Sequence, residues 1–246
     1  MVEAKKLAYA DLFRYNADPD FVKVPLTKLL STSYAASLCG KFDPHHASPT
    51  GPPSGADMKG DTIVLSTADK EGNMVSWVNS NFSEFGSGIT VPGYGFVLHN
   101  RGTLFSLDPK SPNAIAPHKR PFNTLSAGLL MRDGQPVMTV TLMGGDMQAQ
   151  GHAQLLVNVI DLGANVQAAA DMARFRHNQI ANVLSLESSI ASAVKAPLEA
   201  MGHSVRSISG ANVGGVQVIQ AVRPQAGLPY YRGASDFRKD GQAVGW

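Results

Sequence analysis

Two alternating segments joined by a short polar turn set the first limit on how this chain folds. Residues 62–67 and 74–79 alternate between apolar and polar side chains, which is typical of strands with one buried face. The turn between them, residues 69–73, contains a glycine and an asparagine, the residues that adopt positive φ most easily. We therefore predict a β-hairpin whose first strand opens with Thr62.

A threonine that opens a strand directly after the pair Gly60-Asp61 suggests a self-cleaving hydrolase, in which the nucleophile becomes a new N-terminus. A threonine hydroxyl is a weak nucleophile that needs a base, and the freed α-amine of Thr62 would supply one. The pKa of such an amine is about 7.7–8.0 in model peptides, so a useful fraction is neutral near pH 7. The plainer alternative is a β-branched residue at a strand start, and the hairpin alone does not separate the two.

Composition excludes several classes of protein. The chain has 246 residues, enough for one sizeable α/β domain or two small ones. Its formal net charge of +2 comes without a long run of like charge, which argues against nucleic acid or an anionic membrane as the main partner. Cys39 is the only cysteine, so an intrachain disulfide is excluded. No apolar run is long enough to span a bilayer, and residues 2–15 are too charged for a signal peptide.

The remaining periodicity predicts alternating helices and strands. Helical spacing is found in residues 2–15, 26–30, 34–38, 148–162, 166–173 and 190–201. Strand patterns are found in residues 96–98, 129–131, 137–142, 205–208 and 216–222, followed by a glycine-rich closing segment. Asp133-Gly134 predicts a tight turn between two of these strands. Helices and hairpins interspersed in this way favour α+β layers over a doubly wound parallel sheet.

Residues 42–60 contain many prolines, glycines and serines and almost no apolar side chains, so we expect a flexible surface linker there. His45-His46 could be read as a metal-binding pair, but a third ligand at suitable spacing is missing, which favours solvent-exposed loop residues. A linker that ends just before Thr62 would allow the two ends of a cut chain to separate.

A second chemical feature is Gly144-Gly145, at the junction between a predicted strand and a predicted helix. Two glycines at a helix N-terminus expose backbone N–H groups beside the positive end of the helix, where an oxyanion can bind. The alternative is an ordinary tight turn. Asp146, which follows, is well placed to cap the helix.

Several separated segments together resemble the gamma-glutamyltransferase family of N-terminal nucleophile hydrolases. The matching positions keep their order and spacing over residues 62–246; they are Thr62, Ser66, Asp69, Gly72-Asn73, Val75-Ser76, residues 85–88, residues 119–121, Gly144-Gly145, Val157-Asn158, Asp161, Arg174-Phe175 and residues 233–238. The resemblance implies an α+β fold, a four-layer αββα sandwich that is incomplete because most of the large subunit is absent. It also implies a division into residues 1–42, the end of the large-subunit region, residues 43–61, a linker before the autocleavage site, and residues 62–246, the small catalytic subunit.

The resemblance also assigns roles by position. Thr62 matches the nucleophile released by cleavage after Asp61, Ser80 matches a hydroxyl residue that orients it, and Gly144 and Gly145 match the oxyanion-hole glycines. The expected substrate-binding residues are Asn81, Arg101, Asn123 and Thr124.

Departures from the family pattern bear on specificity. Ile63 and Val64 follow the nucleophile where the family usually has Thr or Tyr and then His. Phe82, Arg101 and Leu104 stand where typical members bind the substrate's α-amine. Arg101 would repel an ammonium group and attract a carboxylate, which favours the acylase-like bacterial branch. Alternatively, Arg101 is a surface residue or the partner in a structural ion pair.

The resemblance implies transfer or hydrolysis of the γ-glutamyl group, or a similar acyl group, of glutathione-like amides through a Thr62 acyl-enzyme. No metal or organic cofactor is expected, because the threonine amine is the base. The expected partners are a small amide, glutathione-like or dicarboxylic, and the large subunit of the same precursor, with no nucleic acid; a homo-oligomer is left open. Two alternatives stand beside this: a glutaryl or cephalosporin-type acylase, and a catalytically silent truncated fragment. The compartment is open, with the cytoplasm favoured over the periplasm or secretion.

Overall fold

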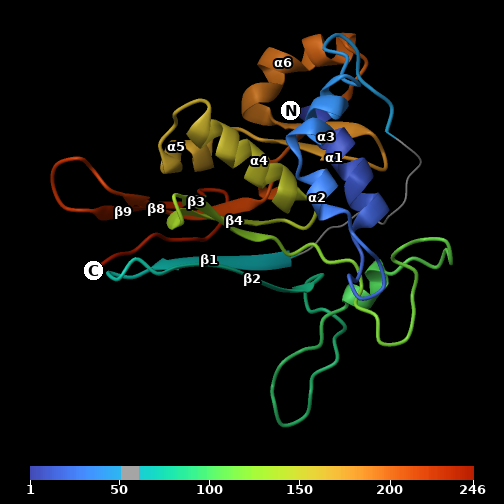
Figure 1. Ribbon diagram of the computed structural model, residues 1–246, viewed down its shortest axis with the longest axis horizontal. Helices are drawn as coiled ribbons and strands as arrows, with labels where there is room; N and C mark the ends of the chain where they lie inside the picture. Colours follow the sequence, from blue (N-terminus) through green and yellow to red (C-terminus); the bar gives the residue numbers. More distant parts are fainter. Residues whose placement is uncertain (51–60) are drawn as a thin grey trace.

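The computed structural model describes residues 1–50 and 61–246, which form a mixed α/β arrangement (Figure 1). The hairpin consists of β1 (Asp61–Ala68) and β2 (Met74–Phe82). A four-stranded sheet has the order β3-β4-β8-β9, with bounds Ala127–Arg132, Gln135–Met143, Gly215–Val222 and Tyr230–Ser235. A smaller sheet has the order β5-β6-β7, with bounds Phe175–Asn178, Val183–Glu187 and Ser204–Ile208.

The helices are α1 (Val2–Tyr15), α2 (Leu26–Leu29), α3 (Thr32–Cys39), α4 (Met147–Ile160), α5 (Val166–Asp171) and α6 (Ser188–Ala200). Two short 3₁₀ segments, Arg101–Leu104 and Gly210–Asn212, are also formed. No helix in the described part of the chain is long and apolar enough to cross a membrane.

The four-stranded sheet is covered on both faces. Helices α4 and α5 contact one face, through β4, β8 and β9, and the β1–β2 hairpin lies against the other (Figure 1). The described residues therefore form three layers, and the further helical layer of the predicted four-layer sandwich is not among them. This explains the buried run at the centre of β4, where Met138 and Leu142 are almost inaccessible to solvent.

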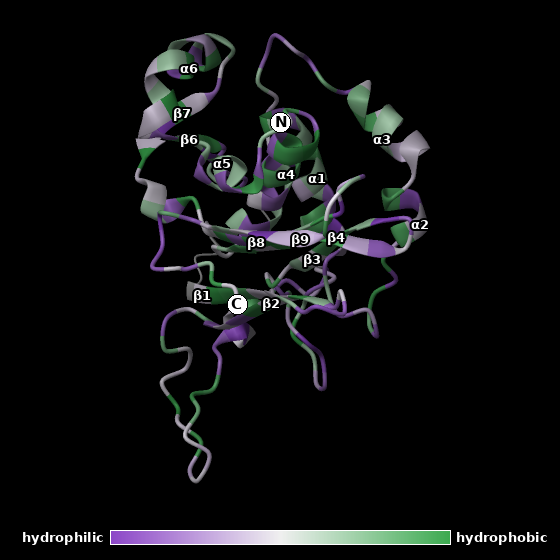
Figure 2. Ribbon diagram, turned by 90° about the vertical axis from the view of Figure 1, so that its left-hand side faces the viewer, coloured by the Kyte–Doolittle hydropathy of each residue, from purple (hydrophilic) through white to green (hydrophobic). Residues whose placement is uncertain are grey.

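The outer face of the hairpin is apolar and exposed. Ile63, Leu65, Val75 and Trp77 are 70%, 55%, 46% and 57% exposed. In Figure 2 the ribbon of β1 includes green, hydrophobic residues. The inner face carries Ser66 and the other alternate residues toward the sheet. The period-2 pattern in the sequence thus distinguishes two faces of the hairpin, and among the described residues only the inner face is covered.

Most predicted elements are confirmed within a few residues, including the hairpin, the turn at Asp133-Gly134 and helices α1, α4, α5 and α6. The predicted strand 96–98 is wrong: Val97 forms only an isolated bridge with Thr90. Strands β5, β6 and β9 were not expected from the sequence. Asp146 occupies the N-cap position of α4 but makes no capping hydrogen bond.

The linker prediction falls largely on residues 51–60, outside the described residues. His46 is exposed and its Nδ1 lies 2.9 Å from Asp43 Oδ2. Among the described residues, no group of three or more His, Cys, Asp or Glu side chains could hold a metal ion.

Candidate active site

Thr62 lies at an irregularity in the hairpin. Asp61 pairs with Phe82 and Ile63 pairs with Asn79, so the single residue Thr62 is opposed by the two residues between those partners, Ser80 and Asn81. Such bulges re-aim a side chain and are common beside active sites. Thr62 is 8% exposed, although it stands at the end of the strand.

Hydrogen bonds that involve β1 and the turn that follows it fix the orientation of the hairpin on the four-stranded sheet. Ser66 Oγ lies 2.6 Å from Thr141 Oγ1 and donates to the carbonyl of Gln217 at 3.1 Å. Beyond the strand's other end, the Tyr231 hydroxyl donates to the carbonyl of Asp69 at 2.8 Å. Thr62 therefore lies toward the opposite end of the sheet, where β4 finishes and Gly144-Gly145 follows.

The Gly144-Gly145 turn requires glycine at its first position and favours it at its second. Gly144 has φ +135° and Gly145 has φ +61°, and a Cβ on Gly144 would lie 3.1 Å from the Cα of Gly214. The carbonyls of the two glycines accept hydrogen bonds from the amides of Met147 and Gln148 at 3.0 and 3.2 Å, which begins α4. The turn is thus the N-terminal approach to a helix of 14 residues, the place where a developing negative charge is best stabilised.

Arg101 joins two of the other predicted residues. Its Nη2 donates to Ser80 Oγ at 2.6 Å and its Nη1 donates to Thr124 Oγ1 at 3.2 Å. The guanidinium carbon lies 5.5 Å from the centre of the Phe82 ring. Arg101 is only 4% exposed, and within the described residues no carboxylate is bonded to it. Burial lowers the pKa of its guanidinium.

The other two predicted substrate-binding residues are Asn81 and Asn123. Asn123 is exposed, and its Oδ1 accepts a hydrogen bond from the amide of Leu125 at 2.9 Å. Asn81 is half-buried, and its carbonyl accepts from the amide of Asn100 at 3.1 Å. The structure therefore brings Ser80, Arg101 and Thr124 together, while the Asn123 side chain is bonded within its own loop.

Phe82 is held in an unusual backbone conformation beside the site. Its φ is +80°, in a region that bulky side chains rarely adopt, at a cost of about 1–3 kcal/mol. Its side chain is buried with Phe122, and Leu12, Phe13 and Leu104 pack around the pair. The apolar cluster thus holds the end of β2 in a strained form that a free strand would not keep.

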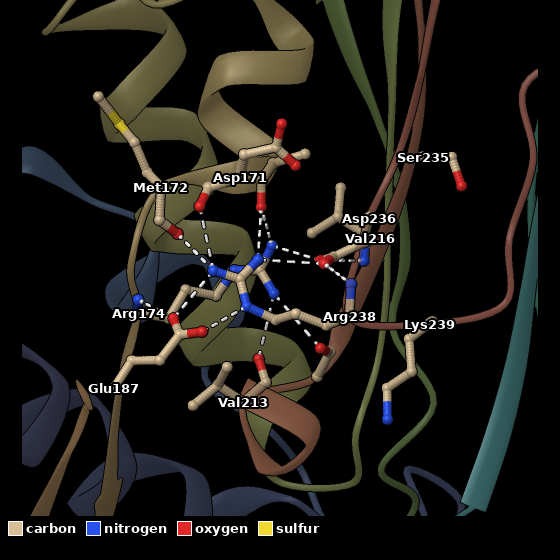
Figure 3. A network of polar contacts seen from close by, with 12 residues as sticks. Asp171, Met172, Arg174, Glu187, Val213, Val216, Ser235, Asp236, Arg238 and Lys239 are labelled. Atoms are coloured by element: carbon tan, nitrogen blue, oxygen red, sulfur yellow. Dashed lines mark hydrogen bonds and ion pairs between the residues drawn. The ribbon is translucent and has the colours of Figure 1, made fainter. Parts of the chain in front are cut away.

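Two ion pairs behind the glycine turn were not predicted from the sequence, although Asp146, Arg174 and residues 233–238 were singled out there for other reasons. Arg176 Nη2 donates to Asp146 Oδ1 at 2.6 Å, directly after the turn. On the other side, Arg174 Nη1 donates to the carbonyls of Val213 and Gly214, each at 3.3 Å, and its Nη2 lies 2.5 Å from Asp236 Oδ2 (Figure 3). Neither pair has a local sequence signal, because the partners are separated by 30 and 62 residues.

Comparison with known proteins shows which family the chain resembles. The oxamate amidohydrolase proenzyme of Klebsiella pneumoniae is 36% identical over all of this chain and 46% of its own length. The glutathione hydrolase proenzyme of Escherichia coli is 34% identical over 83% of this chain and 38% of its length. The crystal structure of cephalosporin acylase from Bacillus halodurans superposes with a TM-score of 0.88 at 36% identity, covering 100% of this chain and 44% of that one.

The chain thus spans less than half the length of these relatives. The gamma-glutamyltranspeptidase family matches it over residues 1–246. Relatives in this family carry names of hydrolases and acylases, many of them proenzymes. The resemblance stated from separated sequence motifs is therefore confirmed, and the chain belongs to the gamma-glutamyltranspeptidase family.

Proposed function

We propose that the whole protein hydrolyses or transfers the acyl group of an amide through a Thr62 acyl-enzyme, and that its preferred acyl group ends in a carboxylate without an α-amine. The observation that carries the substrate class is the buried Arg101 guanidinium. A buried charge without a counter-ion is strongly destabilising. A substrate carboxylate would supply the missing anion.

The chemistry follows from groups near the hairpin end. Cleavage between Asp61 and Thr62 frees the α-amine of Thr62, which takes the proton of its own hydroxyl as Oγ1 attacks the amide carbon. The charge that develops on the carbonyl oxygen would be stabilised by the amides at Gly144 and Gly145. The C–N bond then breaks, the amine leaves with the proton, and water or a second amine releases the acyl group from Thr62.

Ser80 is suited to a positioning role in this scheme. Its hydroxyl accepts a hydrogen bond from Arg101 at 2.6 Å, so its own proton is free to be donated. Ser80 lies opposite Thr62 in the hairpin register. A Ser80 hydroxyl held in this way would orient the Thr62 nucleophile. Arg101 would connect a bound carboxylate to Ser80, because its guanidinium can contact both.

The proposed partner is the large-subunit part of the same precursor. The chain spans less than half the length of its relatives, and the exposed outer face of the hairpin carries large apolar side chains. An apolar face of this kind is typical of a surface that another part of a protein covers. We infer that residues encoded before this chain pack there.

The γ-glutamyl group remains the second candidate for the acyl donor, because the Escherichia coli relative is named a glutathione hydrolase. The two substrates differ in one group: a γ-glutamyl amide carries an α-ammonium, which Arg101 would repel, and a glutaryl amide does not. The choice therefore depends on the residue at position 101.

The nucleophile is tested by intact mass of the purified full gene product beside a Thr62→Ala variant. We expect the wild type to separate into two chains between Asp61 and Thr62 and the variant to stay whole. If both stay whole, the protein is a catalytically silent member and the proposal is wrong.

The substrate class is tested with glutaryl- and γ-glutamyl-p-nitroanilide. Arg101→Gln should lower kcat/KM for the glutaryl amide by about 10- to 100-fold, the range of a charge-assisted hydrogen bond, and leave the γ-glutamyl amide unchanged or improved. Arg101→Lys keeps the charge and is the matched control. Equal losses on both amides would assign Arg101 a structural role.

A further inference from the structure

The residue that follows the glycine turn is held by a part of the chain that lies before the proposed cleavage point. The hydroxyl of Tyr9, in α1, donates to the carbonyl of Asp146. Gln150 Nε2 donates to the same carbonyl at 3.3 Å. The Asp146 carboxylate lies 2.6 Å from Arg176 Nη2. Both the main chain and the side chain of Asp146 are therefore bonded.

Tyr9 is itself fixed on several sides. It is 5% exposed, Lys5 Nζ lies 3.7 Å from the centre of its ring, and Phe13 packs edge-to-face at 6.1 Å. Lys5 Nζ also donates to the carbonyl of His177 at 3.0 Å, which anchors α1 on β5. The Tyr9 hydroxyl is thus a rigid donor, with little freedom to follow a moving loop.

The turn needs such a support because glycines restrict the backbone so little. Gly144 and Gly145 adopt positive φ without a side chain to lock them. An oxyanion site stabilises a transition state only when its donors are already in place. The Asp146 carbonyl belongs to the peptide between Asp146 and Met147, so the bond from Tyr9 fixes the backbone one residue beyond Gly145, at the start of α4.

We propose that Tyr9 is a positioning residue for the Gly144-Gly145 oxyanion site, so that after cleavage one chain supplies the support for the other chain's catalytic turn. This rests on the proposed function, because it takes the glycine turn as the oxyanion site. Tyr9 touches no reacting atom. Its loss lowers the population of the aligned turn and leaves the substrate contacts of Arg101 intact.

The test compares Tyr9→Phe with Tyr34→Phe in the full gene product. Both changes remove one hydroxyl, but the Tyr34 hydroxyl donates to Asp11 Oδ2 at 2.8 Å, within the N-terminal helices. The first measurement is amide hydrogen exchange of residues 143–147. The second is kcat and KM on glutaryl- and γ-glutamyl-p-nitroanilide, after cleavage has been checked by mass.

For Tyr9→Phe we expect faster exchange at residues 143–147 and a kcat lower by about five- to tenfold, the size of one hydrogen bond, with KM within about twofold of wild type. Tyr34→Phe should match wild type in both. Unchanged exchange in Tyr9→Phe, or a change in KM alone, overturns the inference. A wild type that neither cleaves nor reacts defeats the proposed function, while the exchange comparison still decides whether Tyr9 holds the turn.

Discussion

Replacing Asp236 by asparagine removes one charge from the buried network shown in Figure 3 and changes little else. Asp236 Oδ2 lies 2.5 Å from Arg174 Nη2 and accepts from the amide of Val216 at 3.0 Å. Its Oδ1 accepts from the backbone amide and Nη1 of Arg238 at 3.0 and 3.1 Å. Burial alone would raise the pKa of Asp236, but the Arg174 guanidinium and the hydrogen bonds hold it below its ordinary value.

The cost of Asp236→Asn is set by which arginine loses its counter-ion. Arg238 keeps Glu187, with contacts of 2.7 and 2.9 Å. Among the described residues, Arg174 retains only the backbone carbonyls of residues 170, 213 and 214 as acceptors for its guanidinium. Breaking one partner of a buried pair costs about 3–5 kcal/mol. Because asparagine keeps one acceptor oxygen, we expect the lower end, about 3 kcal/mol of unfolding free energy.

Urea unfolding followed by circular dichroism measures this loss as a lower midpoint at unchanged slope. Asp171→Asn is the matched control, since its exposed carboxylate accepts from Gln167 at 3.0 Å and carries no ion pair with another described residue. It should change stability by less than about 0.5 kcal/mol. Adding Arg174→Met to Asp236→Asn should recover part of the loss, because it removes the unpaired charge. A loss below about 1 kcal/mol for Asp236→Asn would refute the assignment of a stabilising ion network.

Two further predictions concern packing and pH. Gly151→Ala places a Cβ 2.2 Å from Leu142 Cδ1. The overpacking should cost about 1–3 kcal/mol, more than the helix-propensity gain of about 1 kcal/mol, so we expect the melting temperature to fall. A higher melting temperature would contradict this prediction. His177 has its pKa lowered from 6.5 to about 4, first by burial and then by the charge of Lys5. Between pH 6.5 and 4 the folded protein therefore binds fewer protons at this site than the unfolded chain does. The free energy of unfolding should fall by up to about 3 kcal/mol in total as the pH is lowered from 6.5 to 4. In His177→Gln the urea midpoint should depend less on pH over that range.

Features of the fold that depend on neighbours in the sequence were predictable. The hairpin around residues 69–73 and the turn at Asp133-Gly134 follow from alternation and from residues that accept positive φ. Helix α1 follows from its spacing, and its bounds agree with the expected residues 2–15. The short strands β5 and β6 were not predicted. β5 has only four residues, and its pairing with β6 depends on contacts that the periodicity of the sequence does not show.

The candidate site was predictable as a set of residues but not as a geometry. Thr62, Ser80 and the two glycines came from motif spacing, and the family assignment by comparison supports that route. The contact of Arg101 with both Ser80 and Thr124 joins positions 21 and 23 residues apart through a side chain that no pattern orients. The hydroxyl of Tyr9 reaches Asp146 across 137 residues, a contact that depends on how α1 packs on the finished fold.

Two unfavourable features of the structure lie side by side at the candidate site. Phe82 keeps a positive φ, and the Arg101 guanidinium beside its ring is buried without a bonded carboxylate among the described residues. Each lowers stability, so each persists only where surrounding contacts determine the local structure. Those contacts include Phe13 of α1, stacked at 6.5 Å on Phe122 in the cluster that holds Phe82. Helix α1, which lies before the proposed cleavage point, therefore contacts both the Arg101 side and the glycine side of the candidate site. These contacts would keep the two chains bound after the proposed cleavage.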